Sequence, residues 1–288
     1  MMKKLIRSAI FIPLIAMLVS CSNDSKIPQY DGYELMFNDE FDGETLNEDY
    51  WEYMIGDGSP NTGWGNSELE YYTKENVSIK DSKLIITAKK EDKGGYHYTS
   101  ARLRTKGKVF CTYGRIEALI SLPEQTAMWP AFWMLPETNY EGKGWPWSGE
   151  IDIMEARGRV NDMYTGAVHV ASSSGADNYQ VVSYSFNGEG KSAKEGPKTY
   201  ISDYHLYSLE WDEDELRWLC DNELVGSVPA RFWRRSQADG TYDPFTKDFH
   251  ILINLAVGGN FDNNRTPDPD FVSAEMKIDY VRVYTFKK

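Results

Sequence analysis

The stretch WSGEIDIMEARG, residues 147–158, decides how this chain folds, because it crowds three carboxylates among apolar side chains. On a helix Glu150 and Asp152 would point to nearly opposite sides, since successive residues turn by about 100°. On a strand they share one face, and the two isoleucines share the other. Glu155 then has the wrong parity, so we predict a β-bulge near Met154 that returns it to the acidic face.

Three carboxyl groups on one strand face suit the hydrolysis of a glycosidic bond. That reaction needs one ionised and one protonated carboxyl group, about 5–5.5 Å apart when configuration is retained. On a straight strand residues four steps apart lie about 13 Å apart at Cα, and two long glutamate side chains on a bent strand close much of that distance. Asp152, between them, can hydrogen-bond one glutamate and keep the two pKa values apart. A divalent-metal site or a solvated acidic strand is the alternative that the motif alone leaves open.

The rest of the chain reads as many short strands separated by turns, with no long stretch of helical period. With 288 residues and 41% hydrophobic side chains, it can bury one large core. Strands at short spacing predict an all-β fold of two packed antiparallel sheets. The clearest predicted strands are 84–88, 115–120, 164–170, 204–211, 250–255 and 276–284.

Charge and aromatic content restrict the class of ligand. The net charge is −13, and loss of the three basic residues of the N-terminal leader described below makes it −16. No basic run interleaves with aromatic residues, so we exclude nucleic acid as a partner, and the negative charge disfavours sulfated polysaccharides. Nine Trp and nineteen Tyr favour a ligand with flat apolar ring faces. A neutral glycan fits best.

The sequence EIDIME at 150–155 resembles the catalytic signature of glycoside hydrolase family 16 in its bulged, laminarinase-like form. Further segments that resemble laminarinases are 37–43, 65–72, 99–107, 128–135 and 254–260. The resemblance implies a β-jelly-roll sandwich with an open substrate cleft on its concave sheet, formed by residues 31–288. It also implies that Glu150 is the nucleophile, Glu155 the general acid/base and Asp152 an assisting residue.

Several residues of these segments are candidates for binding sugar. Trp129 and Trp133 are four residues apart and would share a strand face, so both could stack on sugar rings, although core packing is the alternative for each. Trp145 is expected to close the leaving-group side, and the resemblance implies that His169 lies near the acid/base glutamate. The candidates for hydrogen bonds to hydroxyl groups are Arg104, Asn66 and Glu68, and those for reaching the cleft from loops are Trp64 and Trp233.

The N-terminus predicts an exported lipoprotein. Residues 1–20 read as a signal peptide, with Lys3, Lys4 and Arg7 ahead of an apolar run at 9–19 that is too short to span a bilayer comfortably. The letters LVSC at 18–21 resemble a bacterial lipobox, which implies cleavage before Cys21, lipidation of its thiol and a tether over 21–30. We expect an outer-membrane, surface-exposed protein, with a soluble secreted protein as the alternative.

The remaining cysteines and two histidines are predicted to be structural. Cys111 and Cys220 replace apolar strand positions, where a buried thiol behaves as a small hydrophobe, although an exported protein could also bridge them. His205 and His250 lie in aromatic–aliphatic strands and are expected to be structural histidines with satisfied hydrogen bonds.

Calcium is expected on the convex face as a structural ion, and no cofactor is expected for catalysis. The resemblance implies ligands from Asp279 and from backbone carbonyls near Glu40 and Ser82, and oxygen donors of this kind suit Ca²⁺. The alternative is that Asp279 belongs only to a surface ladder of polar side chains.

Taken together, the sequence predicts a retaining endo-β-glucanase that cuts β-1,3- or mixed-linkage β-1,3/1,4-glucan and acts as a monomer. One alternative is an agar- or porphyran-type galactan hydrolase of the same family. Rivals of another class are a non-catalytic surface glycan-binding lipoprotein, which would have no need of both glutamates, and a calcium-dependent adhesin, which would need several acidic loop clusters.

Overall fold

A computed structural model describes residues 27–187, 199–237 and 240–288. The predicted signal peptide, Cys21 and the first part of the tether lie outside the described residues. Within the part that is described, no helix has the length and apolar character to cross a bilayer.

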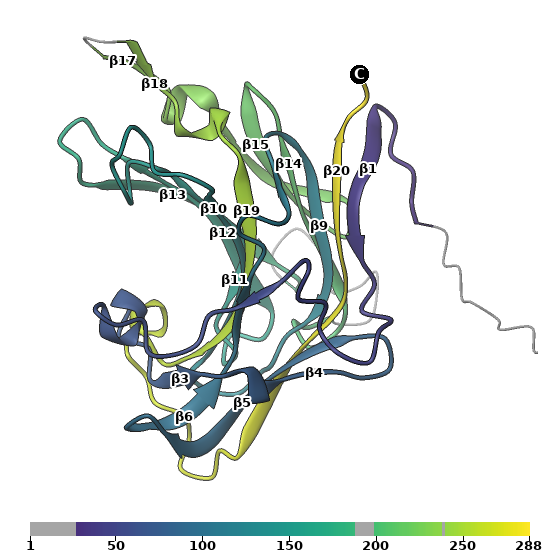
Figure 1. Cartoon of the computed structure of the whole chain (residues 1–288), viewed down its shortest axis with the longest axis vertical. Coiled ribbons are helices and arrows are strands. Elements are labelled where there is room, and N and C mark those ends of the chain that lie inside the picture. The colour runs from purple at the N-terminus through teal and green to yellow at the C-terminus, as the bar shows by residue number, and fades with distance from the viewer. Residues whose placement is uncertain (1–26, 188–198, 238–239) are drawn as a thin grey trace, which may run out of the picture.

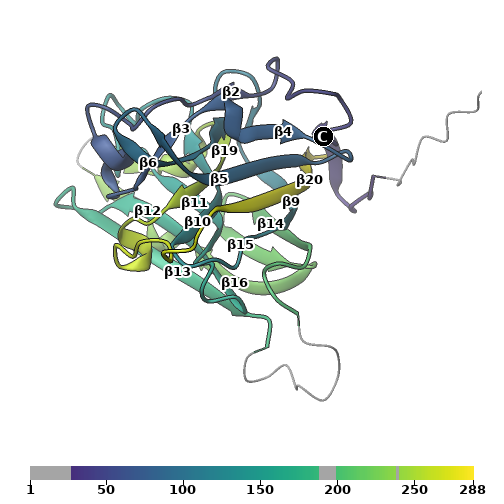
Figure 2. The same ribbon diagram turned by 90° about the horizontal axis from the view of Figure 1, so that it is seen from below.

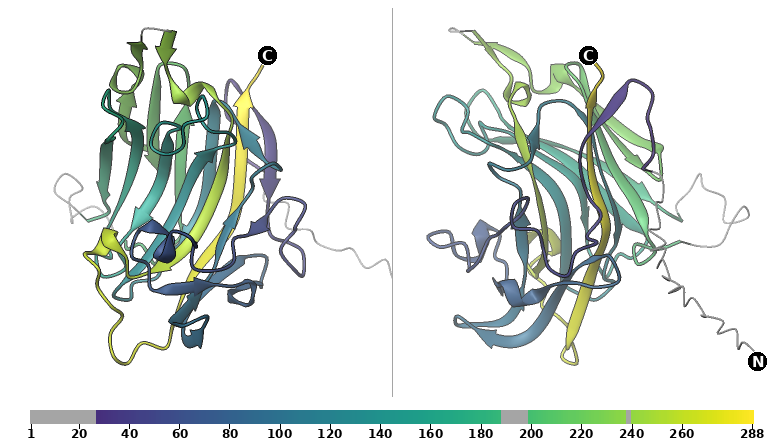
Figure 3. Two further views of the ribbon diagram at one scale, coloured as in Figure 1. Left: turned by 60° about the vertical axis from the view of Figure 1, so that its left-hand side comes forward. Right: turned by 45° about the vertical axis from the view of Figure 1, so that its right-hand side comes forward.

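The described chain folds into two large sheets that stack face to face as curved layers (Figures 1 and 3). The sheet that we call the front sheet contains, in spatial order, β13 (Asp177–Ser185), β12 (Met163–Ala171), β11 (Glu150–Ala156), β10 (Met128–Pro136), β19 (Phe249–Val257), β7 (Arg102–Arg104) and β2 (Glu52–Tyr53), with β8 (Phe110–Cys111) paired to β19. The back sheet contains β16 (Glu223–Pro229), β15 (Glu215–Cys220), β14 (His205–Trp211), β9 (Gly114–Ser121), β20 (Ser273–Phe286), β5 (Leu84–Lys93), β6 (Tyr96–Ser100) and β3 (Glu70–Tyr72), with β1 (Tyr33–Asp39) paired to β20 and β4 (Val77–Ile79) to β5.

Small elements complete the fold. A separate hairpin consists of β17 (Arg235–Gln237) and β18 (Gly240–Tyr242). The short 3-10 helices among the described residues are η1 (Thr62–Gly65), η2 (Lys74–Asn76), η3 (Ala230–Phe232), η4 (Pro244–Thr246) and η5 (Asn260–Asp262). Strand pairs are antiparallel, as for β5 and β20, which lie side by side in Figure 2, except that β3 and β6 are parallel. The predicted all-β sandwich is confirmed, and each of the predicted strands falls on a strand of the structure.

Alternating apolar side chains of the two sheets meet in one core. Trp211 of the back sheet and Phe249 of the front sheet pack edge to face, with ring centroids 5.4 Å apart. Burying one such side chain stabilises the fold by about 1.5–3 kcal/mol. Trp233 also belongs to this core, and its indole N–H donates to Asp243 at 3.0 Å. The expectation that Trp233 reaches the cleft is therefore wrong, because its ring is fully buried.

The structural cysteines are buried, as predicted. Cys111 and Cys220 are both core thiols, one on each sheet. Burial raises the pKa of the Cys111 thiol to about 12, so it stays protonated and unreactive at neutral pH. His205 and His250 are also buried, and burial lowers the pKa of His250 to about 3.

The segment with the three carboxyl groups forms β11 and contains the predicted bulge. Against β12, Asp152 pairs with Ala167 and Glu155 pairs with Thr165, so the β11 segment between the two pairs is one residue longer. The register against β10 shifts at the same place. The extra residue, next to Met154, restores Glu155 to the face of Asp152.

The bulge is supported from the back sheet. The indole N–H of Trp218 donates to the backbone carbonyl of Asp152 at 2.8 Å. Gly166 on β12 makes room for this contact, because a Cβ at that position would lie 2.3 Å from the Trp218 ring. A bulge interrupts ladder hydrogen bonds, and a buried carbonyl that loses its partner is costly. Trp218 supplies a partner for the carbonyl at the centre of the acidic face.

Candidate active site

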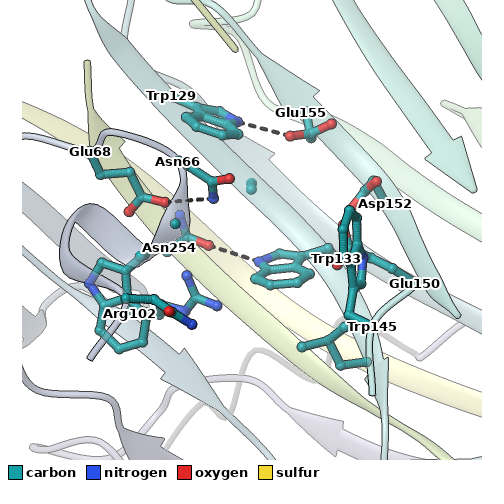
Figure 4. Close-up of a pocket in the computed structure, with 15 residues that line it drawn as sticks. Asn66, Glu68, Arg102, Trp129, Trp133, Trp145, Glu150, Asp152, Glu155 and Asn254 are labelled. Carbon is teal, nitrogen blue, oxygen red and sulfur yellow. Dashed lines mark hydrogen bonds between the residues drawn. The ribbon is translucent and has the colours of Figure 1, made fainter. Parts of the chain in front are cut away.

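The front sheet carries a cleft of about 580 Å³ on its open face. Glu150, Asp152 and Glu155 of β11 all line it, as the parity argument with a bulge predicts. Its walls come from β10, β19, β7 and the loop around η1 (Figure 4). The other lining residues are Asn61, Trp64, Gly65, Asn66, Glu68, Arg102, Trp129, Ala131, Trp133, Leu135, Trp145 and Asn254.

Glu155 is the carboxyl group best suited to carry a proton. Burial, and then the charge of Asp152, raise the pKa of Glu155 to about 8. The indole N–H of Trp129 donates to Glu155 Oε1 at 2.9 Å and acts against that rise (Figure 4). The Trp129 ring is itself held by stacking on Phe261, with centroids 5.1 Å apart. At neutral pH Glu155 is therefore mainly protonated, in a fixed orientation.

Glu150 and Asp152 face a histidine that carries a positive charge. Burial, and then repulsion by Asp152, raise the pKa of Glu150 well above its ordinary value, while the charges of His169 and Arg102 act against this rise. Burial also raises the pKa of Asp152, and His169 opposes it. His169 Nε2 lies 3.4 Å from Asp152 Oδ2, and its Nδ1 lies 3.0 Å from Asp177. Burial disfavours the imidazolium, but these carboxylates outweigh it and raise the pKa of His169 to about 10.

A chain of hydrogen bonds holds the polar side chains on one side of the cleft. Asn66 donates to Glu68 at 3.1 Å, and the hydroxyl of Tyr72 donates to the other carboxylate oxygen at 2.9 Å. Asn254 contacts Tyr72 at 3.4 Å and accepts the indole N–H of Trp133 at 2.8 Å. The network joins the loop before β3 with β3, β19 and β10, and Figure 4 shows its Asn66–Glu68 and Trp133–Asn254 hydrogen bonds. Asn66, Glu68 and Trp133, each predicted to meet the sugar, are thus brought together with Asn254, which the sequence analysis did not select.

Arg102, not Arg104, lines the cleft. Arg104 lies opposite Glu52 of the edge strand β2 and binds its carboxylate through two hydrogen bonds of 2.7 and 3.1 Å. Its guanidinium is therefore bound to Glu52 and does not belong to the cleft wall. The expectation that Arg104 hydrogen-bonds the hydroxyl groups of the sugar is wrong. The guanidinium of Arg102 lies between two indole rings, 4.5 Å from the Trp64 centroid and 4.8 Å from that of Trp133. Residues 102 and 104 share a face of β7, and they differ in their cross-strand partners, since Glu52 lies opposite Arg104 and Asn254 lies opposite Arg102.

Trp145 lines the cleft, whereas His169 does not. Trp145 lines the cleft with its side chain 54% exposed, next to Glu150 (Figure 4). His169 was expected near Glu155, but the structure pairs it with Glu150 across β11 and β12, and it contacts Asp152 without belonging to the cleft wall. Its ring centroid is 6.2 Å from that of Trp145.

Of the expected calcium ligands, the Asp279 carboxylate is engaged in an ion pair. Asp279 binds the ammonium of Lys83 at 2.8 Å, and the Glu40 carboxylate binds Arg282 at 2.8 and 2.9 Å. Ser82 lies next to Lys83 in a turn with a positive φ of 53°. The carbonyls of Glu40 and Ser82 remain the predicted donors, and calcium binding there stays a prediction in which Lys83 would have to leave Asp279.

Two groups of side chains in the described part of the chain bring nitrogen, sulfur or carboxylate oxygen atoms within 4.8 Å of one another, as a metal ion would require. The groups are Glu150 with Asp152 and His169, and His205 with Cys220 and Asp221. A histidine–carboxylate ion pair lies within each group, at 3.4 Å in the first and 2.7 Å in the second. Each histidine therefore already has a carboxylate partner within its own group.

Two glutamates, one of which holds its proton near neutral pH, in a cleft walled by indole rings, define a glycoside hydrolase. Comparison with known proteins agrees. The chain belongs to glycoside hydrolase family 16: its residues 35–286 match the domain described as Beta-porphyranase A-D, GH16 domain.

Individual relatives are similar over most of this chain. It is 39% identical to the glucan endo-1,3-beta-glucosidase A1 of Niallia circulans over 277 residues, which cover 89% of this chain but 38% of that protein. The beta-glucanase of Rhodothermus marinus is 37% identical over 290 residues, with 98% and 96% covered. The laminarinase catalytic domain from Thermotoga maritima MSB8 is 36% identical, with a TM-score of 0.76 over 90% of this chain and all of that one.

Proposed function

We propose that this chain is a retaining endo-β-glucanase that hydrolyses internal bonds of β-1,3- or mixed-linkage β-1,3/1,4-glucan. The observation that carries the proposal is the bulged strand β11, which places Glu150, Asp152 and Glu155 on one face of an open cleft. An open cleft admits the middle of a polysaccharide chain, whereas a closed pocket would admit only its end.

In the first step Glu150 attacks the anomeric carbon and Glu155 gives its proton to the leaving oxygen. The raised pKa of Glu155 supplies that proton near neutral pH. The form of Glu150 that attacks is the carboxylate; burial raises the pKa of Glu150, and the charges of His169 and Arg102 oppose that rise. Asp152 lies between the two glutamates on β11, and its contact with His169 keeps the positive charge of the imidazolium close to them.

In the second step Glu155, now a carboxylate, takes a proton from water, and the water oxygen displaces Glu150 from the anomeric carbon. The Trp129 indole N–H stabilises Glu155 in this ionised form. One residue therefore acts as acid and then as base, and its two neighbours, Asp152 and Trp129, pull its pKa in opposite directions.

The substrate proposal is supported by the relatives whose names state a β-glucan activity, including one that this chain matches over nearly its whole length. The net charge of −13 also favours a neutral glycan. One observation favours a galactan as the second candidate, because the matching domain description names β-porphyranases.

The test is product chromatography after the tether-free protein is incubated with laminarin, barley β-glucan, lichenan, agarose and porphyran. Oligosaccharides from the glucans, absent with Glu150→Ala, are the expected result. Products from agarose or porphyran alone would replace the substrate while keeping the carboxyl chemistry, and turnover by Glu150→Ala equal to that of the unsubstituted protein would refute the assignment.

We also propose that the chain is anchored to the outer membrane through lipidated Cys21, with the lipobox-like residues 18–21 as the support. Labelling cells with a radioactive fatty acid tests this. The unsubstituted chain should carry label and Cys21→Ser should not. Label on both, or on neither, would contradict the proposed anchor.

A further inference from the structure

The front sheet continues beyond the catalytic strand on the side away from the cleft walls. Two strands lie there, β12 next to β11 and β13 at the edge (Figure 1). Cross-strand pairing places His169 opposite Glu150, and Tyr179 opposite His169. Directly paired residues point to the same face of a sheet. Tyr179 therefore shares the open face with the carboxyl groups, about 9.5 Å away across two strand spacings.

This part of the sheet exposes apolar side chains that the core does not use. Tyr179 is 60% exposed and Val181 is 45% exposed, whereas Val182, which has the opposite parity, packs against the core. Val181 pairs with Ala167, which pairs with Asp152, so it is also aligned with the acidic face.

The Tyr179 ring is held in position by the active-site histidine. It stacks on His169 with ring centroids 5.3 Å apart and an interplanar angle of 22°. On the other side His169 meets Trp145, which is 54% exposed at the cleft. Aromatic rings thus continue without interruption from the cleft wall across β12 to the sheet edge.

We propose that Tyr179, with Val181 beside it, forms a binding surface for the sugar units on the leaving-group side of the scissile bond. This surface, the β12–β13 shelf, rests on the proposed function. The glycosyl unit that stays bound to Glu150 needs the side with many hydrogen-bonding groups, where Asn66 and Asn254 lie. The shelf is open and offers mainly the exposed side chains of Tyr179 and Val181, so it suits sugars that must depart before water enters.

The shelf makes a second reaction partner available to the covalent intermediate. When an acceptor sugar is stacked on Tyr179, its hydroxyl oxygen can form the new bond to the anomeric carbon as the bond to Glu150 breaks, and its proton passes to Glu155. Water does the same when the shelf is empty. Occupation of the shelf therefore controls the ratio of transfer to hydrolysis.

The experiment compares the unsubstituted protein with Tyr179→Ala, Tyr179→Phe and a control, Tyr204→Ala, which removes a 39% exposed tyrosine from the back-sheet side. The substrates are laminarihexaose, which must occupy both sides, and 4-nitrophenyl β-laminaribioside, whose leaving group is not a sugar. Transfer to added laminaribiose is measured in parallel with hydrolysis.

For Tyr179→Ala we expect kcat/KM on laminarihexaose to fall about threefold to tenfold, with a lower transfer-to-hydrolysis ratio and unchanged hydrolysis of the aryl glycoside. Tyr179→Phe keeps the ring and should behave like the unsubstituted protein, as should Tyr204→Ala. Unchanged cleavage of laminarihexaose by Tyr179→Ala would refute the shelf. An equal loss of activity on both substrates would also refute it, because Tyr179 would then act through His169. If the unsubstituted protein cleaves neither substrate, the proposed function itself fails.

Discussion

Replacement of Trp129 by Phe tests how the structure sets the protonation of Glu155. The substitution removes the indole N–H that lies 2.9 Å from Glu155 Oε1 and keeps an aromatic ring to stack on Phe261. A hydrogen bond to a charged group contributes about 1.5–3 kcal/mol, and one pKa unit corresponds to about 1.36 kcal/mol. Because the indole stabilises the carboxylate, its loss disfavours the ionised form. The pKa of Glu155 should then rise by about one to two units.

The assay is the pH dependence of kcat/KM, which reports ionisations of the free enzyme. Glu155 must be protonated to act as the acid, so activity of the unsubstituted protein should fall above about pH 8. In Trp129→Phe this alkaline limb should move to higher pH. Trp133→Phe is the matched control, because it removes an indole donor that binds Asn254 and no carboxyl group. An alkaline limb that stays in place in Trp129→Phe, or moves to lower pH, would refute the reasoning.

Three other predictions follow from single contacts. Because the folded-state pKa of Glu155 lies above its ordinary value of 4.5, its contribution to stability is fully present below about pH 4.5 and is lost as pH rises through about 8. Glu155→Gln should therefore raise the free energy of unfolding, and with it Tm, more at pH 8 than at pH 5, by about 3.5 kcal/mol, and an equal Tm change at both pH values would contradict this. Gly166→Ala should displace Trp218 and lower both Tm and kcat, with a loss of about 1–3 kcal/mol, whereas unchanged thermal unfolding would show that the close contact is unimportant. Asp177→Asn removes a carboxylate that favours the imidazolium, so an NMR titration should show His169 losing its proton at lower pH than in the unsubstituted protein, and an unmoved titration would exclude that role.

Much of the site could be predicted because its determinants are local. The period of a strand is two residues, so the spacing of Glu150 and Asp152 fixes their shared face without reference to any other part of the chain. The parity of Glu155 then requires an extra residue, and the structure has the bulge where it is needed. The same alternation places Trp129 and Trp133 together on the cleft face.

What only the tertiary structure decided depends on which strands become neighbours. Arg102 and Arg104 are equivalent by parity, and they differ because β2 brings Glu52 opposite one of them. Trp233 could have belonged to a cleft loop, but Asp243 holds its indole N–H inside the core. These choices come from contacts between different strands and loops, which no local period encodes.

The amino-acid sequence by itself thus determined the strand, its bulge and the chemistry of its three carboxyl groups. The tertiary structure decided their protonation, because the pKa of Glu155 depends on its burial in the cleft wall and on Trp129 from the adjacent strand. It also decided the extent of the binding surface, since Tyr179 comes to lie in line with Glu150 only through the pairing of β11, β12 and β13. Sheet register is a property of several strands at once, and that is why the shelf could not be read from any one of them.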